Sequence, residues 1–455
     1  IVLEKGPDYP YPHLEPFREA IDYHYANPAW WPPADLERIT SSGTYLRDLS
    51  RERVMRVGGS GTAWAALTMR IGPNDMRTRS RYGFGDDWPI DYDALEPWLC
   101  RAEEHLGVSG TDDDNPWAPP RSRPYPLPPF EPTDDDALLG ERLSRAGIHL
   151  HTTPQARTRL DYRGRPGCMN YGECQVCPIG ARYSPNVHLA LALATGRCEL
   201  RTRCSVRRIA TDAAGRARAV VCRTLGEPDD REIPADLVVV AAAGIDSARL
   251  LLLSRDARHP DGLGNRGGHV GRHLVFHHVW SGHLHYPERQ HPGRVGYWTT
   301  QSAQFCDPPG RGRHGGVKLE FASKLWNEHI QEAGRAVTVA EAMRRFEITL
   351  HCRHVAIHAE STTGDGKRVS LSGARDRFGD PVPHVHYVCD DFDLRTYDYG
   401  KALFERVARA TGAVEWHYRT LEDFATVAHH MGTCRMGTSE HDSVTDSFGA
   451  VHDTP

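Results

Sequence analysis

The chain has 455 residues, which is too long for one small core and predicts two or three domains. Its 55 basic and 60 acidic residues give a net charge of -5, and no basic stripe of the kind that nucleic acid requires is visible. The longest strongly apolar run, residues 237–245, is far shorter than the roughly 20 residues of a membrane span. With 42 glycines and 32 prolines, the composition favours a loop-rich α/β or α+β enzyme.

The first predicted element is a short strand at residues 1–3 that ends at Glu4. A dinucleotide-binding fold places an acidic residue at the end of its second strand, where it holds the ribose of the cofactor. That residue normally follows a glycine-rich phosphate turn, and no G-x-G-x-x-G pattern precedes Glu4 in the chain. We therefore expect the turn to precede Ile1. Taken alone, Glu4 is an ordinary carboxylate at the end of a strand.

The next notable stretch is a glycine-rich turn, Gly58-Gly59-Ser60-Gly61, which Trp64 follows. Adjacent glycines followed by small hydroxyl residues allow main-chain N–H groups to approach a cofactor closely. As a bare pattern the turn is common.

Helices are predicted at residues 14–25, 92–106, 136–146, 185–195, 244–253 and 397–410. In the second of these, Asp91 is the expected cap, Gly107 the end, and the apolar residues Leu95, Trp98, Leu99, Ala102 and Leu106 the inward face. Ser184 is the expected cap of the fourth helix.

Strands are expected at residues 198–211 and 218–225, joined by a turn at Gly215. The apolar run 237–240 predicts a fully buried strand of a parallel sheet, and Gly244 follows it at the start of a helix. Residues 261–420 are richer in strands. Three His-x-His pairs are read as solvated strand faces, and no metal site is expected at His149/His151, His283/His285 or His384/His386.

Eleven cysteines form an odd set spread along a long chain, which favours reduced thiols and a cytoplasmic setting. Cys168, Cys174 and Cys177 lie close together and could hold zinc or an iron–sulfur cluster. Such a cluster normally needs a fourth cysteine, and Met169 stands where it would fit. The motif therefore favours a thiol-lined loop, with the cluster kept as an alternative.

The densest chemical stretch is residues 429–437, which begins with the adjacent pair His429 and His430. Histidine is the side chain best suited to exchange a proton near neutral pH. A lone histidine in such a loop would more often satisfy backbone groups only.

Taken together, these stretches resemble the glucose–methanol–choline (GMC) family of flavin oxidoreductases. The resemblance is carried by residues 58–61, 88–110, 177–181, 237–247 and 429–437. It implies an α/β fold in which a discontinuous, Rossmann-like FAD-binding domain is combined with an α+β substrate domain on an antiparallel sheet. It also implies roles for single residues: His429, three residues before Gly432, is the catalytic base, and Glu4 binds the ribose. The remaining cofactor-binding residues implied are Gly58, Gly59, Ser60, Gly61, Trp64, Val206 (at the adenine) and Gly244.

The resemblance divides the chain into alternating parts of the two domains. The FAD-binding domain is expected at 1–85, 165–260 and 421–455, and the substrate domain at 86–164 and 261–420. The family's second catalytic residue, a His or Asn, is expected beyond the chain given.

Trp64 and the Cys-Pro-Ile-Gly-Ala-Arg loop are similar to the pyranose oxidase and bacterial sugar and gluconate dehydrogenase branches. Pyranose oxidases link a histidine before this Trp covalently to the flavin, whereas this chain has Ala63, so we expect non-covalent FAD. The expected reaction is oxidation of a CH–OH group of a sugar, glycoside, polyol or sugar acid by hydride transfer to flavin N5.

Two alternatives stay open: an oxidase of a non-sugar alcohol with dioxygen as acceptor, and a cysteine-based iron–sulfur electron carrier. The expected partners are a small alcohol or sugar and an electron acceptor (dioxygen, a quinone or a redox protein). Neither nucleic acid nor a membrane span is expected.

Overall fold

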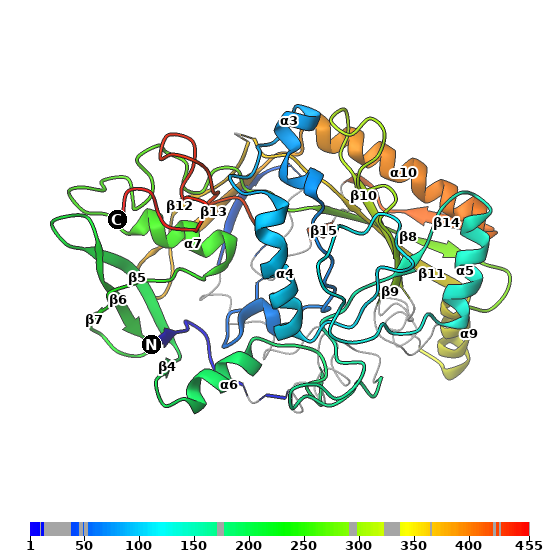
Figure 1. The fold of residues 1–455 in the computed structure, drawn as a ribbon, viewed down its shortest axis with the longest axis horizontal. Coiled ribbons are helices and arrows are strands. Elements are labelled where there is room, and N and C mark those ends of the chain that lie inside the picture. The colour runs from blue at the N-terminus through cyan, green and yellow to red at the C-terminus, as the bar shows by residue number, and fades with distance from the viewer. Residues whose placement is uncertain are drawn as a thin grey trace.

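The computed structural model describes residues 1–9, 11–12, 38–44, 49, 53–170, 177–290, 298–322, 337–364, 366–421, 425–426 and 429–454. The helix expected at 14–25 lies outside these residues, as does Cys174. Figure 1 shows the described chain as two lobes, with β5 to β7 and α7 in one and a large antiparallel sheet in the other. This arrangement agrees with the expected α/β fold built from two kinds of unit.

The first lobe combines a parallel strand pair with a three-stranded antiparallel sheet. The N-terminal strand β1 (Val2–Leu3) pairs in parallel with β4 (Leu200–Arg201). The sheet joins β5 (Cys204–Thr211), β6 (Ala217–Thr224) and β7 (Arg231–Pro234), and it confirms the hairpin expected around Gly215. Helix α7 (Ala243–Leu253), which ends at Ser254 as expected, packs against β5.

The buried parallel strand expected at 237–240 is wrong. These residues form no strand, and Leu237 and Val239 are 79% and 78% exposed. A fully buried parallel strand needs neighbouring strands on both sides and helices on both faces. Within the described residues no strand pairs with 237–240, so Leu237 and Val239 face solvent, whereas Val238 and Val240 pack against the core.

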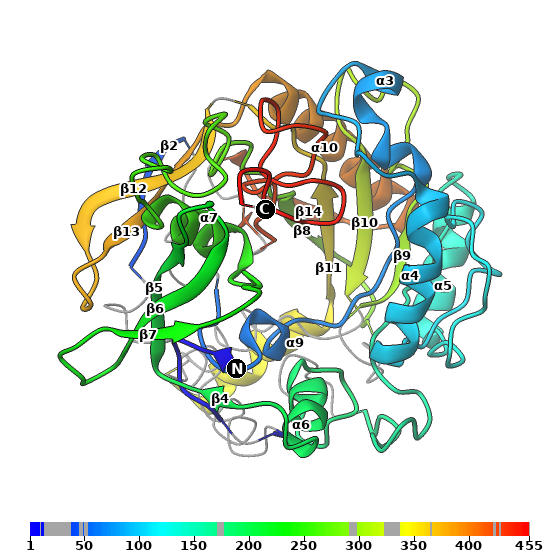
Figure 2. The same ribbon diagram turned by 60° about the vertical axis from the view of Figure 1, so that its left-hand side comes forward.

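The second lobe is built on a seven-stranded antiparallel sheet with the order β14-β8-β11-β10-β9-β3, in which β15 also pairs with β8. Its strands are β3 (His151–Thr152), β8 (His278–His285), β9 (Trp298–Ser302), β10 (Val317–Ala322), β11 (Cys352–Ala359), β14 (Glu415–Tyr418) and β15 (Ala425–Thr426). A smaller sheet joins β2 (Thr40–Gly43), β12 (Lys367–Arg375) and β13 (Pro381–Tyr387), and Figure 2 shows it beside α7.

One face of the large sheet is apolar and is covered by the long helix α10 (Asp391–Thr411) (Figure 1). The helix buries Leu403, Phe404 and Val407, as its spacing predicts. A Cβ at Gly282 in β8 would lie 2.2 Å from the Phe404 ring, so only glycine lets the helix approach this closely.

The opposite face of the sheet is largely polar. Lys318 pairs with His358 across β10 and β11, and Glu320 lies two residues further along β10 on the same face. A small apolar cluster interrupts this face, formed by Val279, Trp298, Ala322 and Ala356 with Ala65 and Leu67 packed on it. The chain that follows the Gly58–Gly61 turn therefore lies over the polar face.

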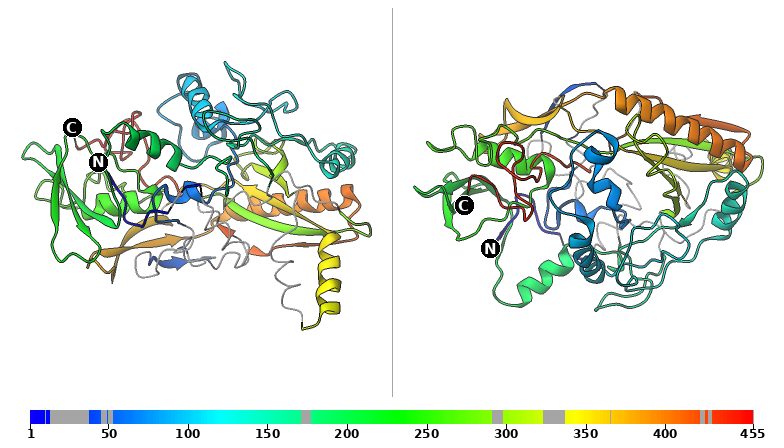
Figure 3. Two further views of the ribbon diagram at one scale, coloured as in Figure 1. Left: turned by 90° about the horizontal axis from the view of Figure 1, so that it is seen from below. Right: turned by 45° about the horizontal axis from the view of Figure 1, so that its top comes forward.

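The other helices surround these sheets. They are α3 (Thr78–Tyr82), α4 (Tyr92–Leu106), α5 (Asp134–Ser144), α6 (Asn186–Ala194), α9 (Val339–Leu350) and the 3-10 turns η2 (Gly59–Thr62) and η3 (Pro73–Met76). Helix α9 projects from the body (Figure 3, left). The cap expected for α6 is wrong, because the Ser184 hydroxyl donates to the Asn186 side chain instead of accepting a helix N–H. No helix within the described ranges is long and apolar enough to span a membrane.

Helix α4 begins and ends as predicted, with Asp91 accepting from the Ala94 N–H and Gly107 in the left-handed region at φ 65°. Its predicted inward face is wrong: Trp98 is 61% exposed. The buried face instead contains Tyr92, Glu96, Cys100 and Glu103.

The reason is the guanidinium of Arg70, which lies beneath that face of α4. It donates to Glu96 at 2.9 Å, to Glu103 at 2.8 and 2.9 Å and to the Cys100 sulfur at 3.1 Å. The Arg70 side chain is only 3% exposed. Periodicity of apolar residues could not reveal this, because paired buried charges replace the usual hydrophobic contact.

Replacing Arg70 by Met is expected to lower the free energy of unfolding by about 3 kcal/mol or more, because it leaves two buried carboxylates without their shared cation. The matched control is Arg123→Met, which breaks an exposed ion pair with Glu104 (3.1 Å) and should cost less than about 1 kcal/mol. Urea unfolding followed by circular dichroism measures both. Equal losses in the two variants would contradict a structural role for the Arg70 cluster.

Candidate active site

The stretch 429–437 lies against the segment that leads into β8. Met431 and Val275 exchange two backbone hydrogen bonds of 3.0 Å, and the Gly271 N–H donates to the Thr433 carbonyl at 2.8 Å. These contacts place His429 beside the start of the large sheet. The predicted base therefore lies at one edge of the sheet's polar face.

Three histidines and a glutamate form a continuous chain of close polar contacts there, two of them hydrogen bonds between histidines and one an ion-pair contact. His429 Nδ1 lies 2.6 Å from His277 Nε2, and His277 Nδ1 lies 3.4 Å from His358 Nδ1. His358 Nε2 in turn lies 2.8 Å from Glu320 Oε2, and Lys318 forms an ion pair with the same carboxylate. We call these five residues the histidine chain.

The surroundings keep the first histidines of this chain neutral. Although His429 is exposed on one side, desolvation by the atoms packed around it lowers its pKa to about 4, and the nearby His358 and Lys318 act in the same direction. Burial lowers the pKa of His277 well below its ordinary value, again with help from His358. A neutral imidazole is the form that accepts a proton, so His429 suits a general base.

The end of the histidine chain carries a negative charge. Burial alone would favour the neutral acid, but His358 and Lys318 hold the pKa of Glu320 below its usual range. The residue is only 1% exposed. The carboxylate therefore stays ionised inside the protein.

Gly244, the first-turn residue of α7, lies directly against this stretch. A Cβ there would come within 2.5 Å of the His430 carbonyl oxygen, and the Thr433 hydroxyl donates to the Gly244 carbonyl. No side chain caps the N-terminus of α7 in the described structure. Its first N–H groups are thus available to a polar ligand next to the 429–437 stretch.

The Gly58–Gly61 turn and the residues after it are held in place by hydrogen bonds with the segment 182–186. The Arg182 guanidinium donates to the carbonyls of Gly61 and Trp64 at 3.2 Å each, and the Trp64 indole N–H donates to the Tyr183 carbonyl at 2.9 Å. Gly58 and Gly59 both have positive φ, at 86° and 54°. An ion pair between Arg53 and Asp246 joins the approach to this turn with α7.

Glu4 and Val206 are brought together although 200 positions separate them. The Glu4 carbonyl accepts from the Cys204 N–H at 2.9 Å, at the start of the strand that carries Val206. The Glu4 carboxylate accepts from the Gly6 N–H at 2.7 Å, and desolvation raises its pKa. These contacts group the two residues expected around a cofactor's adenosine.

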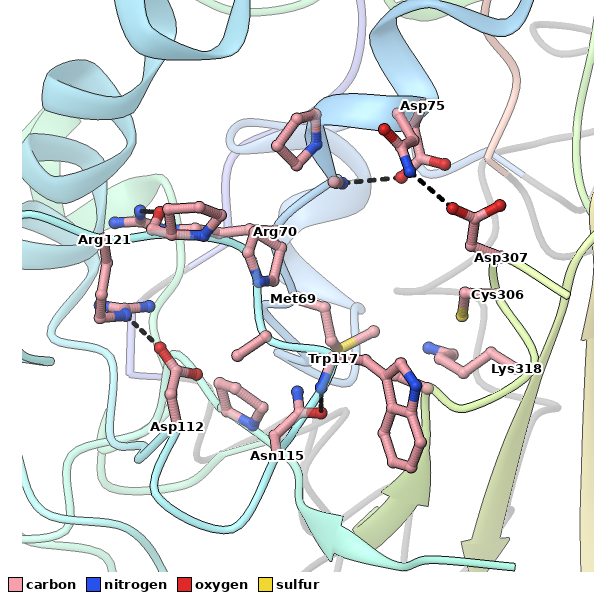
Figure 4. A pocket seen from close by; sticks show the side chains of 18 of the residues that line it. Met69, Arg70, Asp75, Asp112, Asn115, Trp117, Arg121, Cys306, Asp307 and Lys318 are labelled. Carbon is pink, nitrogen blue, oxygen red and sulfur yellow. Dashed lines mark hydrogen bonds and ion pairs between the residues drawn. The ribbon is translucent and has the colours of Figure 1, made fainter. Parts of the chain in front are cut away.

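A cavity of about 370 Å³ opens at the other end of the histidine chain. Figure 4 shows Lys318 and Trp117 facing it, with Arg70, Asp112 and Arg121 on the opposite side. Lys318 thus connects the cavity to the buried Glu320. The predicted base and this cavity therefore lie at separate positions along the large sheet.

The alternative of a metal or iron–sulfur cluster on Cys168, Cys174 and Cys177 finds no support among the described cysteines. The sulfurs of Cys168 and Cys177 accept backbone N–H groups, from Asn170 at 3.3 Å and Arg182 at 3.5 Å, and Cys174 lies outside the described residues.

Among the residues that the structure describes, one group has metal-ligand chemistry: His278, Cys389 and Asp393 lie with ligand atoms within 4.8 Å of one another. The Asp393 carboxylate already binds the Lys367 ammonium at 2.7 Å, and His278 bonds the Tyr387 hydroxyl at 2.9 Å. A lysine thus supplies the positive charge that a metal ion would bring.

Sequence reasoning missed His277, Lys318, Glu320 and His358. None of them lies in a recognisable motif. The alternation Lys318-x-Glu320 in a strand places both on one face, but only the pairing of β10 with β11 brings His358 beside them.

The fold and these residues are those of an α/β protein with an enzyme-like polar site, and comparison with known proteins identifies its family. Residues 144–279 match the model of the N-terminal part of GMC oxidoreductases, and residues 364–455 match the C-terminal part. The chain belongs to the GMC oxidoreductase family, as its motifs predict.

Several curated relatives span most of the chain. It is 29% identical to the fructose dehydrogenase large subunit of Gluconobacter japonicus over 406 residues, 87% of this chain and 73% of that one. It is 29% identical to 2-methyl-1,2-propanediol dehydrogenase of Mycolicibacterium austroafricanum, over 88% of this chain and 74% of that one. It is 28% identical to paromamine 6'-oxidase of Streptomyces fradiae, over 87% and 70%.

Solved structures share the fold at lower identity. Pyridoxine 4-oxidase from Mesorbium loti superposes with a TM-score of 0.58 at 15% identity, covering 100% of this chain and 87% of that one. A formate oxidase variant from Aspergillus oryzae gives 0.62 at 15% identity, covering 99% and 87%. These likenesses agree with the predicted combination of an FAD-binding and a substrate-binding unit.

The neutral histidines predict that the protein loses stability in acid. The pKa values of His278 and His429 are lowered to about 4 from 6.5, and that of His277 also falls, so the unfolded chain binds protons that the folded chain does not. The free energy of unfolding should therefore decrease as the pH falls from about 6.5 towards about 4.

Urea unfolding at several pH values tests this expectation. His429→Asn should reduce the pH dependence of the unfolding midpoint, whereas His441→Asn, which removes an exposed imidazole, serves as the control and should not change it. A midpoint independent of pH in this range would contradict the neutral state of the histidines.

Proposed function

We propose that the protein oxidises a CH–OH group of a sugar, glycoside, polyol or sugar acid to a carbonyl, with His429 as the base and FAD as the cofactor. The observation that carries this proposal is the geometry of His429. Its Nδ1 is engaged by His277, which leaves Nε2 available to a substrate hydroxyl, and its lowered pKa keeps the imidazole neutral.

The residues present fit FAD at three places. Glu4 and the strand of Val206 lie together where the adenosine would bind. The N-terminus of α7, which contains Gly244 in its first turn, has no side-chain cap. The turn containing Gly58, Gly59, Ser60 and Gly61 offers backbone with little side-chain bulk; a Cβ at Gly59 would meet nothing closer than 3.9 Å. When bound, FAD supplies the hydride acceptor at flavin N5.

His429 Nε2 accepts the hydroxyl proton while the C–H bond breaks. The hydrogen bond from Nδ1 to His277 fixes the ring's orientation, so the same nitrogen always faces the substrate. The contact between Gly244 and the His430 backbone holds the stretch at the edge of the sheet's polar face.

The substrate class follows from the relatives and from the polar lining. Fructose and paromamine are named as substrates of two relatives, and the polar sheet face with the nearby cavity presents hydrogen-bonding groups and one indole ring. These groups are suited to a molecule with several hydroxyls. The relatives include dehydrogenases and oxidases, so a screen of sugars, polyols and simple alcohols should be run with a dye acceptor and with dioxygen.

Replacing His429 by Asn should slow flavin reduction by substrate about 100-fold or more, because the base is lost while the cofactor site stays intact. Stopped-flow absorbance of the flavin measures the rate. His430→Asn is the matched control and should have a much smaller effect, since the assigned register places only His429 as the base. If His430→Asn proves the more damaging change, the register is wrong.

The flavin should be released into the supernatant when the loaded protein is precipitated with acid, because Ala63 stands where a histidine forms the covalent link in pyranose oxidases. Absorbance of the supernatant and of the dissolved pellet measures the distribution. Flavin retained in the pellet would show that another residue forms a bond to it.

A further inference from the structure

We propose that the histidine chain is a proton relay that carries the substrate's hydroxyl proton from His429 through His277 to His358. The buried carboxylate of Glu320 stabilises the positive charge that then forms on His358. This inference rests on the proposed function of His429 as the base. It assigns positioning and charge-stabilising roles to residues that no sequence motif marks.

The donors and acceptors of the chain agree along its whole length. If Glu320 is ionised and His358 is neutral before the reaction, His358 Nε2 donates to the carboxylate and His358 Nδ1 is an acceptor. His277 Nδ1 then donates to His358, and His277 Nε2 accepts from His429 Nδ1. The remaining nitrogen, His429 Nε2, is therefore an acceptor, as a base requires.

The relay step conserves protons and moves no electrons between the residues. The substrate O–H bond breaks and an N–H bond forms at His429 Nε2, while the Nδ1 proton of His429 passes to His277 Nε2. The Nδ1 proton of His277 passes to His358 Nδ1. His429 and His277 end neutral, and His358 ends as an imidazolium paired with Glu320.

The sheet makes this transfer favourable. An isolated imidazolium at His429 or His277 is disfavoured by burial and by the positive charge of Lys318, whereas His358 lies 2.8 Å from a carboxylate. The charged and titratable groups that face the relay are Lys318, Glu320 and His430, besides its own three histidines. Glu320 and Lys318 have opposite charge and contact each other, so their removal should have opposite effects.

The test compares the pH dependence of flavin reduction in Glu320→Gln and Lys318→Met. Removing the Glu320 carboxylate should slow flavin reduction about tenfold or more and move the acid limb of the pH profile to lower pH. The reason is that the positive charge formed on His358 is no longer stabilised by a neighbouring carboxylate. Removing the ammonium should move the acid limb to higher pH. A purely structural role cannot produce shifts of opposite sign.

A second readout needs neither flavin nor substrate. Histidine titrations followed by NMR on ¹⁵N-labelled protein should show the His429 midpoint falling in Glu320→Gln and rising in Lys318→Met, because Glu320 raises the pKa of His429 and Lys318 lowers it. His283→Asn, on the same sheet face but outside the relay, should leave both measurements unchanged. If Glu320→Gln does not fold, Lys318→Met alone still decides the direction.

The outcomes separate the relay from the base. If the acid limb shifts in the same direction in Glu320→Gln and Lys318→Met, or does not shift, the relay is contradicted. The proposed function is still supported in that case if His429→Asn reduces flavin slowly. If His429→Asn reduces flavin at the wild-type rate, the proposal that His429 is the base is wrong, whatever the effects of Glu320→Gln and Lys318→Met.

Discussion

The large antiparallel sheet has one apolar and one polar face, and this division organises the molecule. Helix α10 seals the apolar face so closely that Gly282 must lack a side chain under Phe404. The polar face is then free to hold Lys318, Glu320 and His358 in fixed register. Because the strands are stiffly paired, groups placed on this face keep the positions that proton transfer needs.

The charges on this face depend on one another. A lone glutamate with 1% exposure would be neutral, and a lone histidine chain would have no preferred polarity. Lys318 keeps Glu320 ionised, and the ionised carboxylate orients His358, His277 and His429 in turn. The Arg70 cluster under α4 is similar in one respect: in both places, paired buried charges of opposite sign take the place of apolar packing.

Membership of the GMC oxidoreductase family and the polarity of the histidine chain are independent lines of reasoning. The family matches cover residues 144–279 and 364–455, whereas Lys318, Glu320 and the Gly58 turn lie outside both spans. Both lines lead to the same residue, His429, and to the same form of it, a neutral imidazole. The domain limits inferred from resemblance stay a prediction.

The sequence alone determined the family, the hairpin at Gly215 and the ends of α4, because each depends on local residue types or short motifs. It was wrong about the inward face of α4 and the strand at 237–240, where burial depends on distant partners. Only the tertiary structure decided that His277, His358 and Glu320 join His429. Strand pairing brings together residues far apart in the chain, and no local pattern records which strands become neighbours.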